Sequence, residues 1–533
     1  MKVIFQPPTI PENEKTPFVL QLFALIEHQG VIIEQQAEQI QQLKDEIARL
    51  KNQPPRPKIK PSSLEKKKKG KSKTSKGKRA GSKKRRKTAK LTIHQDQPIE
   101  PEDIPNGSEF RYYKPFVVQD LKLEAHNIRY RLKVYKAPDG SYVVGKLPAY
   151  LNGGHYGPSL IRFVLYQYYH CHVTQPLLLE QLHELDIDIS TGQLNNILIE
   201  NKERFHQEKD LILAVGLEVS SYINVDDTGA RHKGKNGYCT HIGNELFSWF
   251  ESTESKSRIN FLELMRVGHS DYCINIDAIG YMQSYKLPQK SLKPMIAKLG
   301  MIFANDSQWH DFLADNGIVK DRHVQIATEA VLIGSIIEHG ISKHLVIISD
   351  DAGQFNVLLH GLCWIHANRA IDKIIAFSDQ AQKDLDIVKD QVWLLYEGLK
   401  KYKHNPKLKE KKRLQDMFDK IFYSKTSSAT LNTVLKRIYK NKSELLLVLD
   451  RPDIPLHNNG AENAIREYVK KRKISGSTRS ELGRRCRDTF TSLKKTCRKL
   501  GLSFWQYLKD RIERIGFIPD LSELIRDQAL KPG

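Results

Sequence analysis

The chain has 533 residues, a formal net charge of +23 and six cysteines. This length predicts several domains, and the excess of positive charge favours a polyanionic partner. The cysteines are scattered without a CxxC pair, which argues against a disulfide framework and against a cysteine zinc finger. There is no run of about 18 apolar residues and no signal peptide, so we expect a soluble protein inside the cell.

Residues 1–52 carry a helical heptad pattern. Apolar residues recur every seven positions, and leucines follow several of them by three, which is the a/d seam of a coiled coil. A single amphipathic helix docked on its own protein is the alternative, but the sustained 3.5-residue period is more than docking requires. We therefore predict a coiled-coil helix that makes the protein a homo-oligomer. The seam consists of Val19, Leu22, Ile26, Ile33, Ile40, Leu43, Ile47 and Leu50.

Residues 53–107 are predicted to form a basic, disordered linker. Residues 51–90 contain nineteen Lys and Arg residues and one acid, Glu65, so they hold most of the net charge. Such a low-complexity segment cannot bury a core. A solubilising spacer is one interpretation, but a lysine-rich arm also holds nucleic acid by releasing counterions, and we predict that role.

Residues 108–217 predict a small β-ribbon and a helix-turn-helix region. The PDG sequence at residues 138–140 is a hairpin signal. Two helical stretches are separated by residues 186–189, with Ser190 or Thr191 as the N-cap of the second. Plain three-helix packing gives the same pattern, whereas in a helix-turn-helix the second helix lies in the major groove. On that interpretation the side chains that read base edges are Gln193, Asn195 and Asn196.

The pattern of residues 218–475 predicts an α/β domain in which two strands end in paired acids. SYINVDD ends with Asp226 and Asp227, and HLVIISDD ends with Asp350 and Asp351. The expected order is three consecutive strands, a helix, and a later strand that pairs with the first strand. This is the element order of a ribonuclease-H-like mixed sheet. This order brings one acid of each pair together, because the strands end at the same edge.

Alternation along the first strand separates its two acids. Asp227 shares a face with Ile223 and Val225, so Asp226 lies on the less apolar side. Alternation does not separate the acids of the second strand. The acids that remain as alternative metal ligands are Asp227 and Asp351.

A third acid is expected, because two divalent ions need a further carboxylate to bridge and neutralise them. The candidate is Glu462 in the stretch NNGAENAIR, at the third position of a helix that Asn459 can cap. Two structural interpretations compete with this one. Glu462 could complete a capping box with Asn459, or form an ordinary i,i+4 pair with Arg466.

The stretches NNGAENAIR, RKISGSTRS and CWIHANR, the last after the second acidic strand, have their counterparts in one family. With the heptad helix, the basic linker and the acidic strand ends in this order, the chain resembles the DDE-type transposases of the insertion sequence 66 family. The resemblance implies metal-dependent cleavage at transposon ends and strand transfer into target DNA, in the bacterial cytoplasm at the nucleoid. Accessory transposition proteins are possible partners. The catalytic acids it implies are Asp226, Asp350 and Glu462.

The same resemblance implies Mg²⁺ as the cofactor, with Mn²⁺ as a substitute. Members of the family often have a cysteine-rich module ahead of the helix-turn-helix, but this chain has no cysteine before Cys171, so no zinc is expected. Two other functions remain open on the same core. One is a DNA-binding regulator that has lost catalysis, and the other is a structure-specific nuclease.

The end of the chain is predicted to be helical and basic. Residues 366–450 are expected to form a helical insertion in the catalytic domain, and residues 476–533 a basic C-terminal helical region. Residues 470–499 contain twelve Lys and Arg residues against two acids. A solvated basic helix is the alternative to a track for the DNA backbone, which we predict here. The backbone-binding candidates are Lys470, Lys471, Arg472, Lys473, Arg479, Arg484 and Arg485.

Overall fold

The computed structural model describes residues 91–148, 151 and 154–531, together with residues 16, 17, 19, 21, 22 and 29. The predicted coiled coil, apart from those six residues, and residues 53–90 of the predicted linker lie outside the described residues. Residues 91–107, the rest of the linker, contain neither helix nor strand. Among the described residues, no helix combines the length and the apolar content that crossing a bilayer requires.

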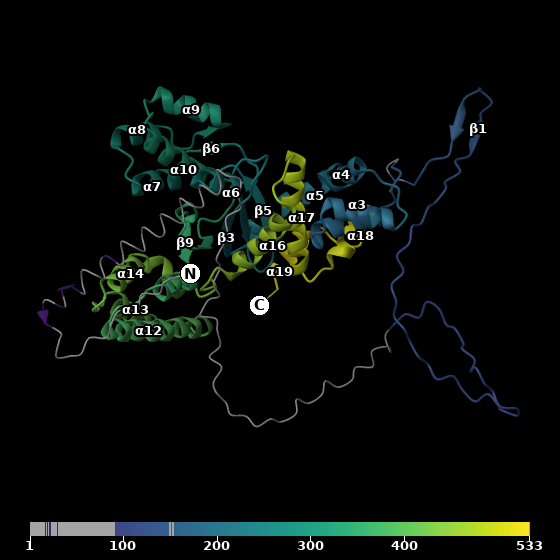
Figure 1. The fold of residues 1–533 in the computed structure, drawn as a ribbon. Coiled ribbons are helices and arrows are strands. Elements are labelled where there is room, and N and C mark those ends of the chain that lie inside the picture. The colour runs from purple at the N-terminus through teal and green to yellow at the C-terminus, as the bar shows by residue number, and fades with distance from the viewer. Residues whose placement is uncertain are drawn as a thin grey trace.

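A β-hairpin projects from the body of the protein (Figure 1). It consists of β1 (Val134–Lys136) and β2 (Tyr142–Val144), paired antiparallel. The turn between them contains the PDG sequence, with Gly140 at a φ of +87°, so the hairpin prediction is confirmed. Residues 108–133 form no strand, so the predicted β-ribbon is limited to β1 and β2.

Short helices follow the hairpin. Ser190 caps the third of them, α4, and forms a capping box with Gln193, so the predicted N-cap is confirmed at Ser190. Leucines of α3 and α4 share one apolar core, so the two helices pack together across the short turn. The bounds are α2 (Pro158–Leu165), a π-helical turn (Tyr166–His170), α3 (Gln175–Glu184), α4 (Thr191–Ile199) and α5 (Glu203–Val219).

The centre of the protein is a mixed five-stranded sheet in the order β5-β4-β3-β8-β9. Strand β4 pairs antiparallel with both β3 and β5. Strand β8 pairs parallel with β3, and β9 pairs parallel with β8. The three consecutive strands, the helix after them and the late strand beside the first were all predicted and are confirmed. The bounds are β3 (Tyr222–Gly229), β4 (Tyr238–Gly243), β5 (Ser248–Thr253), α6 (Arg258–Met265), β8 (Val346–Ser349) and β9 (Leu359–Leu362).

The first of two insertions lies between α6 and β8, a segment for which no structure was predicted. Its central helix α10 is buried along most of its length and packs on α6 and α7. Gly334 allows α10 to lie close to the short strand at Tyr272–Cys273, because a Cβ there would clash with the carbonyl oxygen of Cys273. The elements are β6 (Tyr272–Cys273), α7 (Ile276–Ser284), α8 (Gln289–Ala297), β7 (Ile302–Phe303), α9 (Asp306–Asp315) and α10 (Asp321–Glu338).

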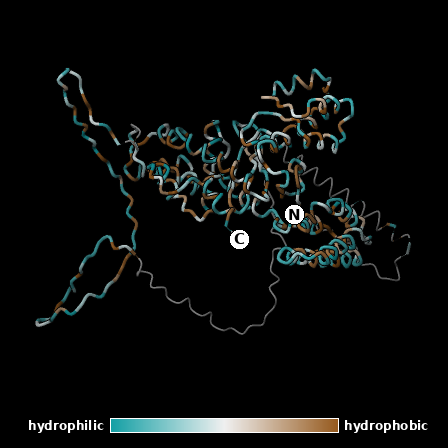
Figure 2. Tube along the Cα trace, turned by 180° about the vertical axis from the view of Figure 1, so that it is seen from behind, coloured by the Kyte–Doolittle hydropathy of each residue, from teal (hydrophilic) through white to brown (hydrophobic). Residues whose placement is uncertain are grey.

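The second insertion follows β9 and is helical, as predicted. It forms a separate lobe with its own apolar core (Figure 1), which joins the sheet through Val346 and Ile348. Figure 2 shows hydrophobic and hydrophilic stretches alternating along the helices of both insertions. The helices are α11 (Trp364–Asp372), α12 (Asp379–His404), α13 (Leu408–Phe422), α14 (Ala429–Lys440) and α15 (Lys442–Leu445), and a 3₁₀ turn at Leu447–Leu449 follows them. Another 3₁₀ turn, Gly353–Phe355, lies between β8 and β9.

Four helices complete the chain and confirm that its C-terminal region is helical. One of them, α17, lies against the edge strand β5, whose outward N–H groups would otherwise lack partners. Side chains at every fourth position of α17 accept these hydrogen bonds: Ser248, Phe250 and Ser252 donate to Thr496, Ser492 and Asp488. The bounds are α16 (Asn459–Ser475), α17 (Glu481–Lys499), α18 (Phe504–Glu513) and α19 (Leu521–Ala529).

Candidate active site

Asp226 lies within β3, which continues to Gly229 rather than ending at Asp227 as predicted, and Asp350 directly follows the neighbouring parallel strand β8. In the pairing of β3 with β8, Asn224 is opposite Ile348. Asp226 and Asp350 each follow two residues later, and residues two apart in a strand point to the same face. The register therefore places these two acids side by side at one edge of the sheet.

The negative charge of neighbouring acids affects the pKa of Asp226. Burial raises that pKa, and the negative charges of Asp350, Asp227 and Glu462 raise it further, to about 8. A backbone hydrogen bond from the N–H of Asp227 opposes the shift only in part. The three acids predicted from the sequence thus act on one another electrostatically, although they come from two strands and a distant helix.

Glu462 enters the site from the first turn of α16. This helix begins at Asn459, and its N-cap residue is Asn458, whose side chain makes no capping bond. The prediction that Asn459 caps the helix was therefore wrong by one residue, and Glu462 is at the fourth helical position. The capping-box interpretation of Glu462 is also wrong, because its carboxylate turns to side chains of α11 and α16.

Asn458 instead fixes the start of α16 to strand β3. Its Nδ2 donates to the carbonyl oxygen of Val225 at 2.7 Å, and its Oδ1 accepts from Nδ2 of Asn224 at 2.9 Å. Gly460 permits this close approach, since a Cβ at that position would lie 3.1 Å from Oδ1 of Asn224. The NNG sequence therefore has a packing reason that the sequence analysis did not identify.

Arg369 holds the carboxylate of Glu462 and was not predicted as a site residue. Its guanidinium nitrogens lie 3.4 and 3.5 Å from the two carboxylate oxygens. Arg466 pairs with the same carboxylate at 3.4 Å, so the expected i,i+4 pair is present. Nε2 of His366 lies 3.8 Å from Glu462 and accepts from Arg369. Arg369 and His366 both belong to CWIHANR, which carried the family resemblance, and that motif was the only signal available.

The three acids do not lie within mutual ligand distance of one another. Among the described residues, one trio of His, Cys, Asp or Glu side chains has ligand atoms that all lie within 4.8 Å of one another, and it is located in the first insertion. Asp226, Asp350 and Glu462 do not meet this distance. The carboxylate of Glu462 is paired with Arg369 and Arg466, so the three acids would have to move closer together to share ions.

The two alternative acids have partners outside the cluster. Oδ2 of Asp227 accepts from Nε2 of Gln354 at 2.6 Å, and burial raises the pKa of Asp227. Oδ2 of Asp351 accepts from Arg437 at 2.7 Å in the second insertion. The geometry therefore separates the acids of the second strand, which alternation in the sequence did not.

A cavity of about 850 Å³ opens beside Asp350, between the sheet edge and the second insertion. Its lining includes three cationic side chains, which could contact a phosphate, and three aspartates, which could contact a cation. Residues of its wall that were described above as part of the site or beside it are Asp350, Asp351, His366, Arg369 and Arg437.

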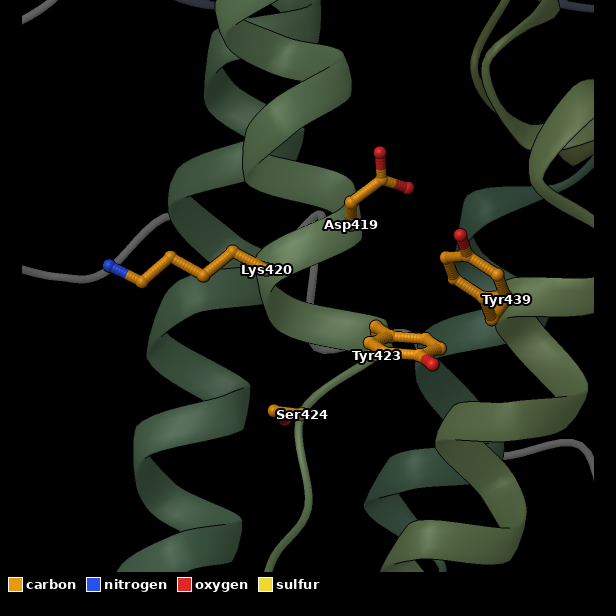
Figure 3. Close-up of a pocket in the computed structure, with 5 residues that line it drawn as sticks. All are labelled: Asp419, Lys420, Tyr423, Ser424 and Tyr439. Atoms are coloured by element: carbon orange, nitrogen blue, oxygen red, sulfur yellow. The ribbon is translucent and has the colours of Figure 1, made fainter.

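A second hollow, of about 400 Å³, lies between α13 and α14. Figure 3 shows Tyr423 and Tyr439 facing each other across it, while Lys420 points away. Their ring centroids are 5.6 Å apart. None of the predicted acids lines this hollow, so it takes no part in the candidate site.

Comparison with known proteins identifies the family. Residues 340–485 match the family described as "Transposase IS66 family", and this span contains Asp350, Arg369 and Glu462. The chain is also 42% identical over 303 residues to the uncharacterized protein y4jO of Sinorhizobium fredii (strain NBRC 101917 / NGR234), an alignment that covers 56% of this chain and 94% of the relative. The chain belongs to the IS66 family of transposases. Its family resemblance, predicted from the sequence, is thereby confirmed, and DNA is the substrate that the family implies.

The residues predicted to read DNA bases in this transposase lie on α4. Asn196 is exposed and Asn195 is half-buried. Gln193 is exposed as well, but its Oε1 accepts from the backbone N–H of Ser190 and from the hydroxyl of Tyr156 at 2.8 Å. Gln193 therefore stabilises the start of α4, and only its amide nitrogen remains for a base.

The predicted DNA-backbone track needs a correction. Lys471 is 3% exposed, donates to the carbonyl oxygen of Tyr168 and lies over the Tyr168 ring, so it is an internal residue. Burial and neighbouring cations lower its pKa to about 7. Arg472 is half-buried and donates to Thr228 at 3.3 Å. Most of α17 is buried as well, because this helix covers the edge of the sheet.

The other candidates of the track lie at the surface. Lys470, Lys473 and Arg479 are exposed. Two arginines at the start of α17 are half-buried and already paired with acids: Arg484 with Glu481 and Arg485 with Glu203.

Proposed function

We propose that this protein is a DDE-type transposase with a ribonuclease-H-like core, which cleaves DNA at transposon ends and joins the ends to target DNA. Asp226, Asp350 and Glu462 are the catalytic acids of the proposal. The observation that carries it is the register of β3 and β8, which sets Asp226 beside Asp350. Burial and the charges of Asp350, Asp227 and Glu462 raise the pKa of Asp226 to about 8, which agrees with such a cluster. Perturbed carboxylates that converge at a strand edge beside a cavity are typical of a functional site.

The donor set fits divalent ions such as Mg²⁺, which prefer carboxylate oxygens. Strong mutual repulsion among the acids supports this fit, since a bound cation offsets it. When bound, the ions would make water or a 3′-hydroxyl a better nucleophile and stabilise the leaving oxygen. Asp226, Asp350 and Glu462 would hold them.

Arg369 has two roles in the proposed reaction. Without DNA it neutralises Glu462, which limits the repulsion among the acids. It also lines the cavity beside Asp350, where a DNA phosphate can compete for the guanidinium. Binding of the substrate would then release Glu462 toward the other two acids. His366 accepts a hydrogen bond from Arg369, and its pKa is lowered by burial, so it orients the arginine as a neutral ring.

The remaining parts of the chain supply DNA binding and assembly in this proposal. Residues 51–90 hold DNA without sequence preference, α4 and the exposed Lys470, Lys473 and Arg479 contact the ends, and residues 1–52 join copies of the chain. Two activities compete with the proposal. An inactive regulator would bind DNA without cutting it, and a structure-specific nuclease would cut DNA without joining it.

Substitution of Glu462 by Gln tests the proposal, because it removes one negative charge and keeps the size of the side chain. Asp351→Asn is the matched control, since Asp351 follows the catalytic strand but pairs with Arg437. We expect Glu462→Gln to lose cleavage of transposon-end oligonucleotides in Mg²⁺ and Mn²⁺ by at least about 10²–10³-fold, the range found when one group that stabilises transition-state charge is removed. Asp351→Asn should retain most of the activity.

Strand joining is measured in the same reactions with a target plasmid. Cleavage without joining would identify a nuclease, and DNA binding by a wild-type protein that never cleaves would identify a regulator. Wild-type cleavage by folded Glu462→Gln protein would contradict the proposal.

A further inference from the structure

A trio of metal-ligating side chains lies in the first insertion, remote in sequence from the catalytic acids. It consists of His269, Asp271 and His339, whose ligand atoms all lie within 4.8 Å of one another. Two of these residues belong to the loop after α6, and His339 is the C-cap residue of α10. The trio therefore connects segments about 70 residues apart.

The trio is joined by direct contacts. Nε2 of His339 lies 2.8 Å from Oδ1 of Asp271, and the hydroxyl of Ser335 donates to Oδ2 at 3.1 Å. The imidazole rings of His269 and His339 are stacked, with centroids 3.5 Å apart and planes inclined by 8°. Both histidines are exposed while Asp271 is half-buried, so solvent has access to the ligand atoms on one side.

The backbone is strained where it presents His269. Val267 has a φ of +55°, in the left-handed region that a β-branched residue rarely adopts. Gly268 follows with a φ of +84°. Such strain persists only where the surroundings fix it. The turn brings His269 over His339, and no other described contact of the His269 side chain accounts for that placement.

We propose that His269, Asp271 and His339 bind one divalent transition-metal ion, with Zn²⁺ as the best match. Two imidazoles and a carboxylate are ligands that zinc accepts, and a water molecule can complete a tetrahedron. Ser335 would keep its bond to the second carboxylate oxygen and so orient Asp271, as partners of metal ligands commonly do.

Binding requires one change in the side chains. A metal ion lies in the plane of each imidazole that binds it, and parallel stacked rings cannot share such an ion. One ring has to turn about its side-chain torsions, and exposure leaves both rings free to do so. The bound ion would fasten the loop after α6 to the end of α10, which leads into β8. It would thus stiffen the connection that precedes Asp350.

This site is independent of the proposed catalytic acids. The absence of a cysteine pattern led to the expectation that the chain needs no zinc, but a site of two histidines and one aspartate from distant segments has no such pattern. Its ligands are brought together only by the packing of α10 on α6 and β6.

Zinc binding to purified full-length protein tests the proposal. We expect the bound Zn²⁺ per chain, measured by equilibrium dialysis and elemental analysis, to fall by one in His269→Ala and in His339→Ala. His310→Ala is the matched control, because His310 pairs with Asp306 at 3.2 Å on the surface but has no second histidine. Zn²⁺ should also raise the melting temperature of the wild type and of His310→Ala more than that of the two site variants.

Cobalt provides a second measurement. Co²⁺ bound by the wild type should give visible absorption that both site variants lack. If His269→Ala is poorly folded, His339→Gln replaces it, since that side chain keeps a hydrogen-bonding group for Asp271. Equal zinc content in the wild type and in the folded site variants would overturn the proposal, as would an equal loss in His310→Ala.

Discussion

Asn224 donates a hydrogen bond from Nδ2 to Oδ1 of Asn458 at 2.9 Å, between residues that are 234 positions apart in the sequence. Both side chains are buried. Asn224 is two residues before Asp226 on β3, and Asn458 is four residues before Glu462 on α16. Together with the bond from Asn458 to the carbonyl of Val225, this contact holds the start of the helix against the strand, and these two elements present two of the three proposed catalytic acids.

Removal of the Asn458 side chain should weaken both the fold and the site. In Asn458→Ala, the buried carbonyl of Val225 and the amide of Asn224 lose their partner, which should cost about 1–3 kcal/mol of unfolding free energy. We also expect slower cleavage of transposon-end DNA at temperatures where the variant is folded. Denaturant titration and the cleavage assay measure these effects. Asn459→Ala, one position further on, is the control and should change both by much less.

The pKa of Asp226 predicts a pH-dependent gain in stability for Asp226→Asn. The folded pKa of about 8 lies above the ordinary value of 3.8, so the folded state binds the extra proton between these values. The contribution of Asp226 to stability is thus full below pH 4 and is lost as the pH rises toward 8. Without divalent metal, Asp226→Asn should exceed the wild type by roughly 0.5–2 kcal/mol at pH 8. The difference should shrink at pH 5.

Unfolding curves at the two pH values test this sign, with EDTA present throughout. A stability difference that is equal at pH 5 and pH 8 would show that the pKa of Asp226 in the folded protein does not lie between these pH values. Addition of Mg²⁺ at pH 8 should reverse the order of the two proteins, because only the wild type has all three acids for the ions.

The parts of the fold that could be predicted from the sequence depend on local patterns. The apolar strand HLVIISDD ends in acids, and Ser190 and Ser257 precede helices, so strands, caps and one edge of the site follow from neighbouring residues. The partners of Glu462 could not be predicted in the same way. Arg369 is 93 positions away from Glu462 and reaches it only because α11 folds back beside α16.

The main error in the sequence-based prediction was that basic residues of the C-terminal region were expected to be exposed, whereas several of them are buried. A helix with many Lys and Arg residues indicates a solvated or DNA-facing surface, yet α17 is buried and covers the edge of the sheet. Its polar side chains accept hydrogen bonds from β5, a strand more than 200 positions earlier. Periodicity indicates which residues share a face of a helix. It does not indicate that this face will pack against the backbone N–H groups of an edge strand.

The corrected positions of three neighbouring lysines give a test of the DNA surface. Lys471 is internal, whereas Lys470 and Lys473 are exposed. Substitution of either exposed lysine by Ala should lower DNA affinity and reduce the slope of log K against log salt concentration by about one phosphate contact. Lys471→Met, which preserves volume in a buried place, should leave that slope unchanged. Fluorescence anisotropy at several salt concentrations measures the slope, and a reduced slope in Lys471→Met would contradict the burial argument.

The basic arm at residues 51–90 should supply affinity without sequence preference. Its nineteen Lys and Arg residues against one acid can release many counterions from DNA, so its deletion should flatten the salt dependence by several phosphate contacts. Affinity for unrelated DNA should fall by about the same factor as affinity for the transposon end, because phosphate contacts carry no sequence information. The measurement is a salt titration of both DNAs with the full chain and with the deletion variant. A variant in which residues 51–90 are replaced by a neutral Gly/Ser segment of equal length separates charge from spacing. Loss of binding to the transposon end alone would mean that the arm reads sequence, and unchanged salt slopes would mean that it does not contact DNA.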